Sequence, residues 1–397
     1  MQNILLTDLN SSNIGCEIII RGTIKFLREN YNPKTNIILP TKTKKHDEML
    51  FSDISNIQFE QTSLLKTFRR FLLRKIDKFI SHYTPRISSD KFLLSTLVVS
   101  IGGDIYDLRK IIPVDQIGYE LYATRHNIPI IMYGANMEGI ENLTDKNRAL
   151  IMLHLKRFQK IFVRDPETVV YLDKIGIKEN IFFYPDPIFQ LRPYINFRLP
   201  PQIKNIGINF SPFMLKLESE KKEILLKNFA SNIEKLIQSG FNITLFPHVC
   251  HENRNPNLDD RESIKTLINY IKPEFKYKVK VIDDKLNLGS VTSEIKNFDL
   301  VIGARMHACL NSFTSGVSTI FIAYGKKAHS MVKWIKNESI FYNVNDYVEC
   351  IDFLQIDDKA LLLMVNELNG KIKTLKSRDI SLDMSDYLNN LYLKSCQ

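Results

Sequence analysis

The alternation of short apolar runs with longer amphipathic segments is the feature that most constrains the fold of this chain. The pattern is most regular between residues 205 and 324. The expected strands there are 205–210, 242–248, 278–283, 299–303 and 318–324, and the expected helices are 218–238, 260–271, 291–298 and 304–315. Such alternation is typical of βαβ units in a parallel sheet, whose strands end at one shared edge.

The N-terminal half repeats the pattern with more interruptions. The expected strands are 3–6, 36–39, 93–101, 129–133, 160–163 and 180–184, and the expected helices are 18–28, 116–126, 145–158 and 166–175. Five prolines between 185 and 201 disfavour regular structure, so we expect an interdomain linker there. The sequence therefore predicts an α/β protein with two Rossmann-like domains, at 1–190 and 202–345, that face one another across a central cleft.

The last residues, 346–397, are expected to form helices at 357–375 and 382–393 that pack back across the linker. A length of 397 residues suits two domains, because single cores rarely grow beyond about 250–300 residues.

Composition narrows the setting of the protein and the kind of partner. The first ten residues do not have the pattern expected of a secretory signal, the apolar run 93–101 is too short to span a membrane, and the five cysteines lack paired spacings. We therefore expect a cytoplasmic protein without disulfides. The formal net charge of +10 indicates an anionic partner, which could be nucleic acid, a membrane surface or a phosphorylated ligand.

The sharpest candidate for a site is the run GARMH at 303–307, which ends an apolar strand. Arg305 can fork onto a carboxylate or phosphate, and the N-terminus of the next helix adds amide donors. His307 falls in the first turn of that helix, where an imidazole can donate a proton near neutral pH. The plainer alternative is a surface arginine followed by a histidine that faces the core.

The following strand ends at Tyr324, and Gly325, Lys326 and Lys327 come directly after it. In a parallel sheet this turn lies on the same edge as Arg305. A lysine there can reach a phosphate as a mobile point charge, although paired lysines are also common in solvated loops. Lys327 is a candidate ligand of the anion, and Tyr324 is a candidate substrate contact.

Two strand ends in the N-terminal half also carry charged residues. Arg164 follows the strand 160–163 and is expected to project into the cleft, while Asp165 fits a helix cap. A Gly-Gly turn after 93–101 leaves Asp104 at the cleft mouth. Asp104 is a candidate general base or acceptor for a sugar hydroxyl, with an ordinary turn aspartate as the alternative.

The segment NIGCE at 13–17 resembles the tight βα turn of a nucleotide-binding unit, and Asn13 and Glu17 are candidate substrate contacts. It lacks the three spaced glycines of a dinucleotide fingerprint, and the chain has no Walker loop. NAD and FAD are therefore not indicated, and no cofactor is expected.

His248 ends the strand 242–248 and stands close to Cys250, His251 and Glu252. Their spacing matches no standard zinc pattern, so a metal site is disfavoured and His248 is retained as a candidate substrate contact.

Residues 63–83 have the pattern of a basic amphipathic helix. Such a helix can lie on an anionic membrane surface, and a domain helix with a solvated basic face fits the pattern equally well. Nucleic-acid binding is not expected, because the chain contains no known binding module.

Taken together, these motifs resemble the polysaccharide pyruvyl transferase family. The most specific part is Arg305-x-His307 followed by Tyr324-x-x-Lys327. The other matching motifs, in order, are Asn13-x-Gly15-x-Glu17, Gly102-Gly103-Asp104, Arg164-Asp165-x-x-Thr168-x-x-x-Leu172-x-x-x-Gly176, Asp186-Pro187-x-Phe189, Gly207-Ile208-Asn209, Pro247-His248 and Gly316-Val317. The resemblance covers roughly residues 3–335.

The resemblance implies a GT-B-like fold and a reaction. Members of the family transfer pyruvate from phosphoenolpyruvate to two hydroxyls of a sugar, forming a cyclic ketal. The implied partners are phosphoenolpyruvate as co-substrate and a glycan or lipid-linked oligosaccharide of a bacterial-type surface polysaccharide. The implied ligands of phosphoenolpyruvate are Arg164, Arg305, His307 and Lys327. We expect His307 to act as general acid and Asp104 as base.

The sequence is also compatible with two other functions. A GT-B glycosyltransferase would use a nucleotide-sugar, with Glu294 or Asp299 available for the ribose. A membrane-surface scaffold without catalysis would use residues 63–83, and the same contact would make an enzyme peripheral to the inner face of the membrane.

Overall fold

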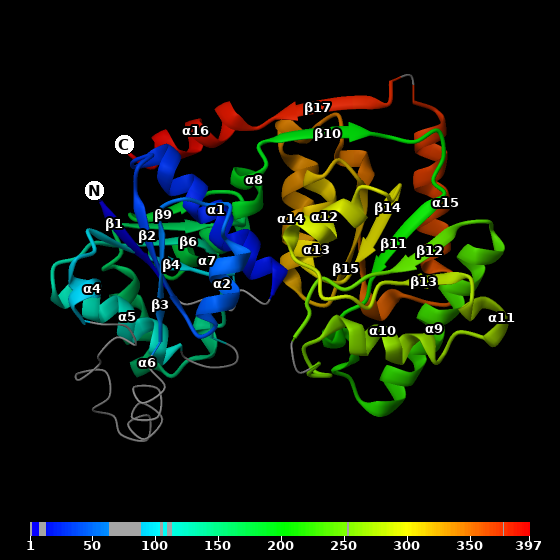
Figure 1. Ribbon diagram of the computed structural model, residues 1–397, viewed down its shortest axis with the longest axis horizontal. Helices are drawn as coiled ribbons and strands as arrows, with labels where there is room; N and C mark the ends of the chain where they lie inside the picture. The colour runs from blue at the N-terminus through cyan, green and yellow to red at the C-terminus, as the bar shows by residue number, and fades with distance from the viewer. Residues whose placement is uncertain are drawn as a thin grey trace. The chain divides into compact units, whose positions relative to one another are not determined.

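Figure 1 shows a computed structural model of the chain, which describes residues 2–7, 13–62, 89–103, 106–108, 113–251, 254–375 and 377–397. The chain divides into two compact units. The first comprises Met1–Ser11, Ile18–Leu191 and Tyr387–Gln397, and the second comprises Ser12–Glu17 and Arg192–Asp386. Asp104 and the expected helix at 63–83 lie outside the described residues.

The first unit is built on a parallel sheet that has seven strands among the described residues, in the order β3-β2-β1-β4-β6-β8-β9. These strands are β1 (Asn3–Leu6), β2 (Asn36–Thr41), β3 (Ile57–Gln61), β4 (Leu97–Ile101), β6 (Ile130–Ala135), β8 (Lys160–Val163) and β9 (Ile181–Phe183). Two short strands, β5 (Tyr106–Asp107) and β7 (Met137–Glu138), pair beside it. The central strands are buried along their whole length, as strands covered on both faces must be.

Helices connect these strands. They are α1 (Ile14–Asn30), α2 (Lys44–Leu50), α4 (Ser89–Leu93), α5 (Val114–Arg125), α6 (Asp145–Leu155), α7 (Pro166–Lys174) and α8 (Pro187–Leu191). The C-terminal helix α16 (Ser385–Lys394) packs onto this unit near α1 (Figure 1). The ring of Tyr392 in α16 meets Phe26 of α1 edge-on, with 5.6 Å between the ring centres.

The second unit contains a parallel sheet of six strands within the described residues, in the order β13-β12-β11-β14-β15-β16. Its strands are β11 (Asn205–Asn209), β12 (Asn242–Leu245), β13 (Val279–Val281), β14 (Leu300–Gly303), β15 (Ser318–Ala323) and β16 (Val348–Asp352). Its helices are α9 (Ser219–Gln238), α10 (Asp260–Ile268), α11 (Pro273–Lys276), α12 (Leu288–Ile295), α13 (Met306–Thr314), α14 (Lys326–Asn337) and α15 (Ala360–Lys373).

The strand order explains where a ligand should bind. Numbered along the chain, the strands of the second sheet lie in the order 3-2-1-4-5-6, which is the Rossmann order, and the first sheet follows it with one more strand. The order reverses between β11 and β14 in the second unit. Ligands of such sheets bind beyond the carboxyl ends of the strands at this switch point. In the second unit, that position is occupied by the residues after Asn209 and Gly303.

The structure corrects the expectation that the proline-rich segment 185–201 lacks regular structure. It holds helix α8 and strand β10 (Tyr194–Arg198), because its prolines start or flank these elements rather than interrupt them. The expected helix at 382–393 is also wrong at its start. Residues 382 and 383 belong to strand β17 (Asp379–Asp383), which pairs antiparallel with β10.

Candidate active site

Arg305 stands at the end of β14, immediately before α13, and its side chain is almost buried. Its Nε donates to Asp260 Oδ1 at 2.9 Å, and its Nη2 donates to the carbonyl of Leu258 at 2.8 Å. Its guanidinium carbon lies 4.6 Å from the centre of the Phe213 ring. The Nη1 group has no hydrogen bond to any residue that the structure describes, so it is the donor available to a ligand.

Asp260, at the start of α10, is fully buried and fixes the surroundings of Arg305. Besides Arg305, it accepts hydrogen bonds from the backbone N–H groups of His248 at 2.9 Å and Val249 at 3.0 Å. The side-chain amide of Asn209 also donates to it at 3.0 Å. Asp260 therefore ties the ends of β11, β12 and β14 together at the switch point.

Asn209 completes the same link from the other side. Its Oδ1 accepts from the backbone N–H of Arg305 at 3.0 Å, which holds the residue that caps α13. The buried side chain of Asn209 is thus hydrogen-bonded through both its nitrogen and its oxygen. A buried polar atom without a partner would cost about 1–3 kcal/mol, so these bonds hold the backbone at Arg305 in place.

His307 lies in the first turn of α13 and is half-buried. A Cβ atom added to Gly15 would stand 2.7 Å from His307 Nδ1, so only glycine allows this approach. Asn13 accepts a hydrogen bond from Gly15 N at 2.9 Å and forms a β-bridge with Val249. Glu17 accepts from the backbone N–H of Leu288 at 3.0 Å. The N-terminal motif therefore belongs to the second unit, against His307.

His248 is only 1% exposed, and its Nε2 has no hydrogen-bond partner among the described residues. Burial holds the pKa of its imidazole well below the usual value, and the nearby His307, Arg305 and Arg192 side chains add to the shift. His248 is therefore neutral at pH 7. Of His248 and His307, His307 is the one that is partly exposed.

Tyr324 follows β15 on the same edge and is 40% exposed. Its ring centre lies 5.9 Å from that of Phe213, the ring that also meets Arg305. Lys216 Nζ lies 4.1 Å from the centre of the Phe213 ring as well. Lys327 is half-buried in the first turn of α14. The edge thus gathers an aromatic pair and several cations, as expected for an anion site.

Three residues of this cluster were not predicted from the sequence, namely Phe213, Lys216 and Asp260. Phe213 and Lys216 follow the carboxyl end of β11. Their position beside the switch point is the signal that could have identified them. Asp260 offers no such signal, since it reaches the site from the start of a helix.

Arg164 belongs to the first unit and is 2% exposed. Its Nη1 lies 2.8 Å from Asp186 Oδ2, and its Nε donates to Asn136. Asp165 accepts from the backbone N–H of Thr168 at 2.8 Å, which confirms its role as a helix cap. The Arg164 guanidinium lies against Gly103, where a Cβ atom would come within 2.3 Å of it. The arginine therefore supports the turn that precedes Asp104.

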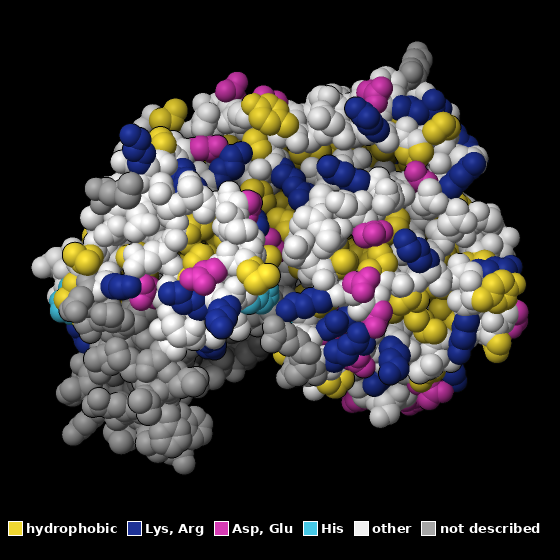
Figure 2. Space-filling view, in the orientation of Figure 1, with side chains coloured by type: hydrophobic (Ala, Val, Ile, Leu, Met, Phe, Trp, Pro, Cys, Tyr) yellow, Lys and Arg dark blue, Asp and Glu magenta, His cyan; other side chains and the backbone are white. Residues whose placement is uncertain are grey.

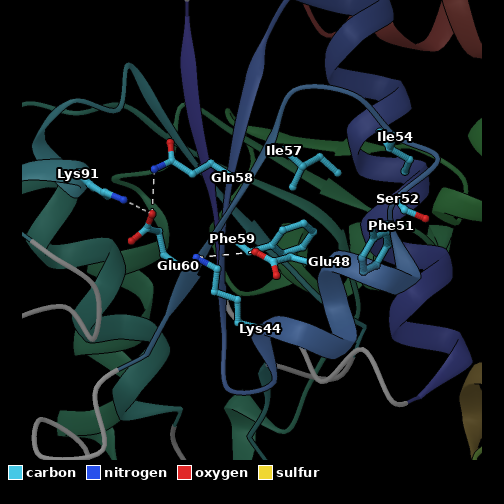
Figure 3. Close-up of a pocket in the computed structure, with 10 residues that line it drawn as sticks. All are labelled: Lys44, Glu48, Phe51, Ser52, Ile54, Ile57, Gln58, Phe59, Glu60 and Lys91. Carbon is cyan, nitrogen blue, oxygen red and sulfur yellow. Dashed lines mark hydrogen bonds and ion pairs between the residues drawn. The ribbon is translucent and has the colours of Figure 1, made fainter.

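The first unit also carries a hollow of about 430 Å³ beside β3 (Figure 3). Glu60 accepts from Gln58 at 2.8 Å and from Lys91, and Lys44 lies 3.8 Å from Glu48. The charges of this hollow are paired with one another. It is lined by none of the residues that the sequence singled out, and we do not assign it to the candidate site.

The fold resembles that of solved sugar-nucleotide enzymes. A putative UDP-N-acetylglucosamine 2-epimerase from Listeria monocytogenes aligns over 100% of this chain and 96% of its own, with a TM-score of 0.59 and 10% identity. The UDP-GlcNAc 2-epimerase of Methanocaldococcus jannaschii aligns over 100% of both chains, with a TM-score of 0.57 and 12% identity. HepE from Anabaena, solved with UDP and glucose, aligns over 99% of both chains, with a TM-score of 0.57 and 10% identity. This likeness shows the fold alone, two Rossmann-like domains of the GT-B type.

A family model described as polysaccharide pyruvyl transferase matches residues 13–326. Because the match covers most of the chain, this protein belongs to the polysaccharide pyruvyl transferase family. The resemblance predicted from the motifs is thus confirmed. A search of curated proteins finds no match.

Two further features concern the described residues only. No helix among them is both long and apolar enough to cross a membrane. Nor do they contain a group of three or more histidine, cysteine, aspartate or glutamate side chains placed to hold a metal ion.

Proposed function

We propose that this protein transfers pyruvate from phosphoenolpyruvate to two hydroxyls of one sugar in a surface polysaccharide or its precursor. The observation that supports the proposal is the pairing of Arg305, with its available Nη1, and the half-buried His307 at the start of α13, in a member of this family. Phosphoenolpyruvate carries a carboxylate and a phosphate, and cations suit both. Net charge alone would not locate the site, because Figure 2 shows basic side chains spread over the visible face.

The proposed reaction balances without an outside reagent. His307 gives a proton to the methylene carbon of phosphoenolpyruvate, which becomes a methyl group and leaves an oxocarbenium centre at the neighbouring carbon. One sugar hydroxyl adds to this centre. The second hydroxyl then displaces phosphate and closes the ketal. The two hydroxyl protons replace the proton given by His307 and protonate the departing phosphate. No metal or organic cofactor is needed.

Positively charged side chains are proposed to hold phosphoenolpyruvate throughout the reaction. Arg305 would contact it through Nη1, and Lys327 would approach as a mobile charge from α14. Arg164 is retained as a donor ligand by resemblance, although its charge is paired with Asp186. Asp104 remains the proposed base.

Asn13, Glu17, His248 and Tyr324 remain proposed substrate contacts, and a glycan or lipid-linked oligosaccharide remains the proposed acceptor. Residues 63–83 would provide any contact with the inner face of the membrane.

The test is transfer in deuterated water. The wild-type protein with phosphoenolpyruvate and a panel of glycosides should release phosphate and give a ketal whose methyl group carries one deuteron, as seen by mass spectrometry. His307→Ala should lower this turnover by at least a hundredfold, because general acid catalysis typically contributes about 10²–10⁴-fold. His126→Ala, which removes an exposed imidazole of the first unit, is the control. Near-normal deuterium transfer by His307→Ala would refute the role.

A nucleotide-sugar enzyme is the second candidate, because the solved relatives in fold include complexes with UDP. The carboxylates suggested for it do not lie at the ligand edge. Asp299 accepts from the backbone N–H groups of Lys204 and Asn205 at the amino ends of the strands, and Glu294 lies 3.7 Å from Lys280. Protection from thermal unfolding by UDP-GlcNAc, without protection by phosphoenolpyruvate, would favour this candidate over ours.

A further inference from the structure

A hollow of about 610 Å³ lies in the second unit at the amino ends of β14 and β15. This is the edge opposite to Arg305 and Tyr324, and α13 runs from one edge to the other. Its volume falls within the range of small-ligand sites, about 300–1,000 Å³. The residues that line it come from three segments of the chain, 192–200, 292–299 and 314–318.

One wall of the hollow is the exposed face of β10. Tyr194, Asn196 and Arg198 alternate along the strand with the buried Ile195 and Phe197, so all three exposed side chains share this face. The Tyr194 side chain is 65% exposed. An aromatic ring held open on a strand offers a flat apolar surface with a polar tip.

Close approach of β10 to the turn after α13 shapes the hollow. Gly316 has φ 79°, and a Cβ atom at this position would stand 1.9 Å from the carbonyl oxygen of Asn196. Glycine is therefore required for the strand to pass here, and the hollow is a built feature of the fold.

Three cations face the hollow with one carboxylate among them. Arg192 donates to Asn311 Oδ1 at 2.6 Å, to Ser315 Oγ at 2.9 Å and to Thr292 Oγ1 at 2.8 Å, all of them neutral oxygens. Burial lowers its pKa to about 10, so it remains charged at neutral pH.

The other two cations lie at the rim. Arg198 and Lys296 form no ion pair with any described residue, and both are exposed. The carboxylate, Asp299, uses Oδ2 to accept two backbone N–H groups. Among the residues that line the hollow the balance of charge is positive, which favours an anionic ligand, and Asp379 and Asp383 of β17 stand opposite Arg198 and Tyr194 at its rim.

Uncharged polar groups are also available. The side-chain amides of Asn196 and Asn297 have no hydrogen bonds to described residues, and the buried Ser318 Oγ has none either. Amides and hydroxyls that alternate between donor and acceptor suit the hydroxyls of a sugar. An open tyrosine ring suits the apolar face of a sugar ring.

We infer that this hollow binds an anionic saccharide, a sugar that carries a carboxylate or a phosphate. Arg198 and Lys296 bind the anion, Tyr194 packs on the sugar ring, and the amides bind its hydroxyls. This is a second site, distinct from the edge that holds Arg305, and it does not depend on the proposed reaction. Arg192 also caps the end of α13, so the variants below leave it unchanged.

Calorimetric titration of the full-length protein tests the inference with four probes: trigalacturonate, glucose 6-phosphate, neutral maltotriose and inorganic phosphate. The two acidic sugars should bind, and maltotriose and phosphate should bind at least tenfold more weakly. A double variant, Arg198→Ala with Lys296→Ala, should weaken acidic-sugar binding by tenfold or more. Tyr194→Ala should weaken it several-fold without changing the unfolding temperature.

The matched control removes the same two charges from the surface of the first unit, as Arg157→Ala with Lys156→Ala. An equal loss in this control would show non-specific attraction and overturn the inference. So would phosphate that binds as tightly as the sugars, or competition by phosphoenolpyruvate, which would place the binding at the Arg305 edge. Unchanged affinity with saturating phosphoenolpyruvate supports a second site.

Discussion

Asp260 is fully buried, and its two carboxylate oxygens accept hydrogen bonds from side chains and backbone groups that meet at the switch point. It also balances the charge of Arg305, which is almost buried. Asp260→Asn would place an amide N–H against a hydrogen-bond donor and leave that charge uncompensated. We expect a loss of roughly 3 kcal/mol in the free energy of unfolding, because breaking a buried ion pair typically costs 3–5 kcal/mol.

The measurement is urea unfolding followed by the fluorescence of Trp334, the chain's single tryptophan, which is buried in the second unit. Asp283→Asn is the matched control, because Asp283 forms an exposed pair with Arg254 at 2.6 Å. Its removal should leave the free energy of unfolding nearly unchanged. Equal effects of the two substitutions would contradict the part assigned to Asp260.

Strand β10 packs closely against Gly316, which lies in the turn after α13. Gly316→Ala should lower the free energy of unfolding by about 1–3 kcal/mol from crowding against Asn196. The left-handed backbone at φ 79° adds roughly 1 kcal/mol. The Gly316→Ala substitution should also weaken the pairing of β10 with β17. Hydrogen exchange of the backbone amides in these two strands measures this effect.

The chain provides a control of opposite sign in Gly370, within α15. A Cβ atom there would meet nothing within 4 Å, and its φ is not in the left-handed region. Gly370→Ala should therefore stabilise the protein by about 0.5–1 kcal/mol, through helix propensity. A loss of stability at both positions would show that crowding at Gly316 is not the cause.

For the protein as a whole, the alternation of short apolar runs with longer amphipathic segments was enough to predict two Rossmann-like domains and most strands of the second sheet. It could not predict β17, because that strand is defined by pairing with β10, with Tyr194 opposite Asp383 far along the chain. Local patterns carry no information on such a partner. The prediction for the prolines between residues 185 and 201 was wrong for the same reason, since a proline disrupts a helix or strand in its interior but not at its end.

The residues of the candidate site also divide into those that the sequence predicts and those that it does not. Arg305 and His307 were predictable because they end an apolar strand, and position in a parallel sheet then places them on the ligand edge. Asp260 and Phe213 were not, because their role lies in side chains that converge from different elements. Convergence of this kind is set by packing and cannot be read from spacing.

The stability of the molecule should also respond to acid through His248. Its folded-state pKa is depressed by burial, so below about pH 6.5 the unfolded chain binds a proton that the folded chain does not. Stability is thus fully present above pH 6.5 and falls as the pH drops toward the folded pKa. Between neutral pH and pH 5.5 this histidine should lower the free energy of unfolding by an amount on the order of 1 kcal/mol. Trp334 fluorescence during urea unfolding at pH 7.5 and 5.5 measures this change in the free energy of unfolding, since Trp334 lies in the same unit.

His248→Gln should reduce the difference in the free energy of unfolding between the two pH values by that amount, because glutamine does not titrate while all other groups remain. An undiminished difference would mean that His248 is protonated in the folded protein, in conflict with its burial beside Arg305 and His307.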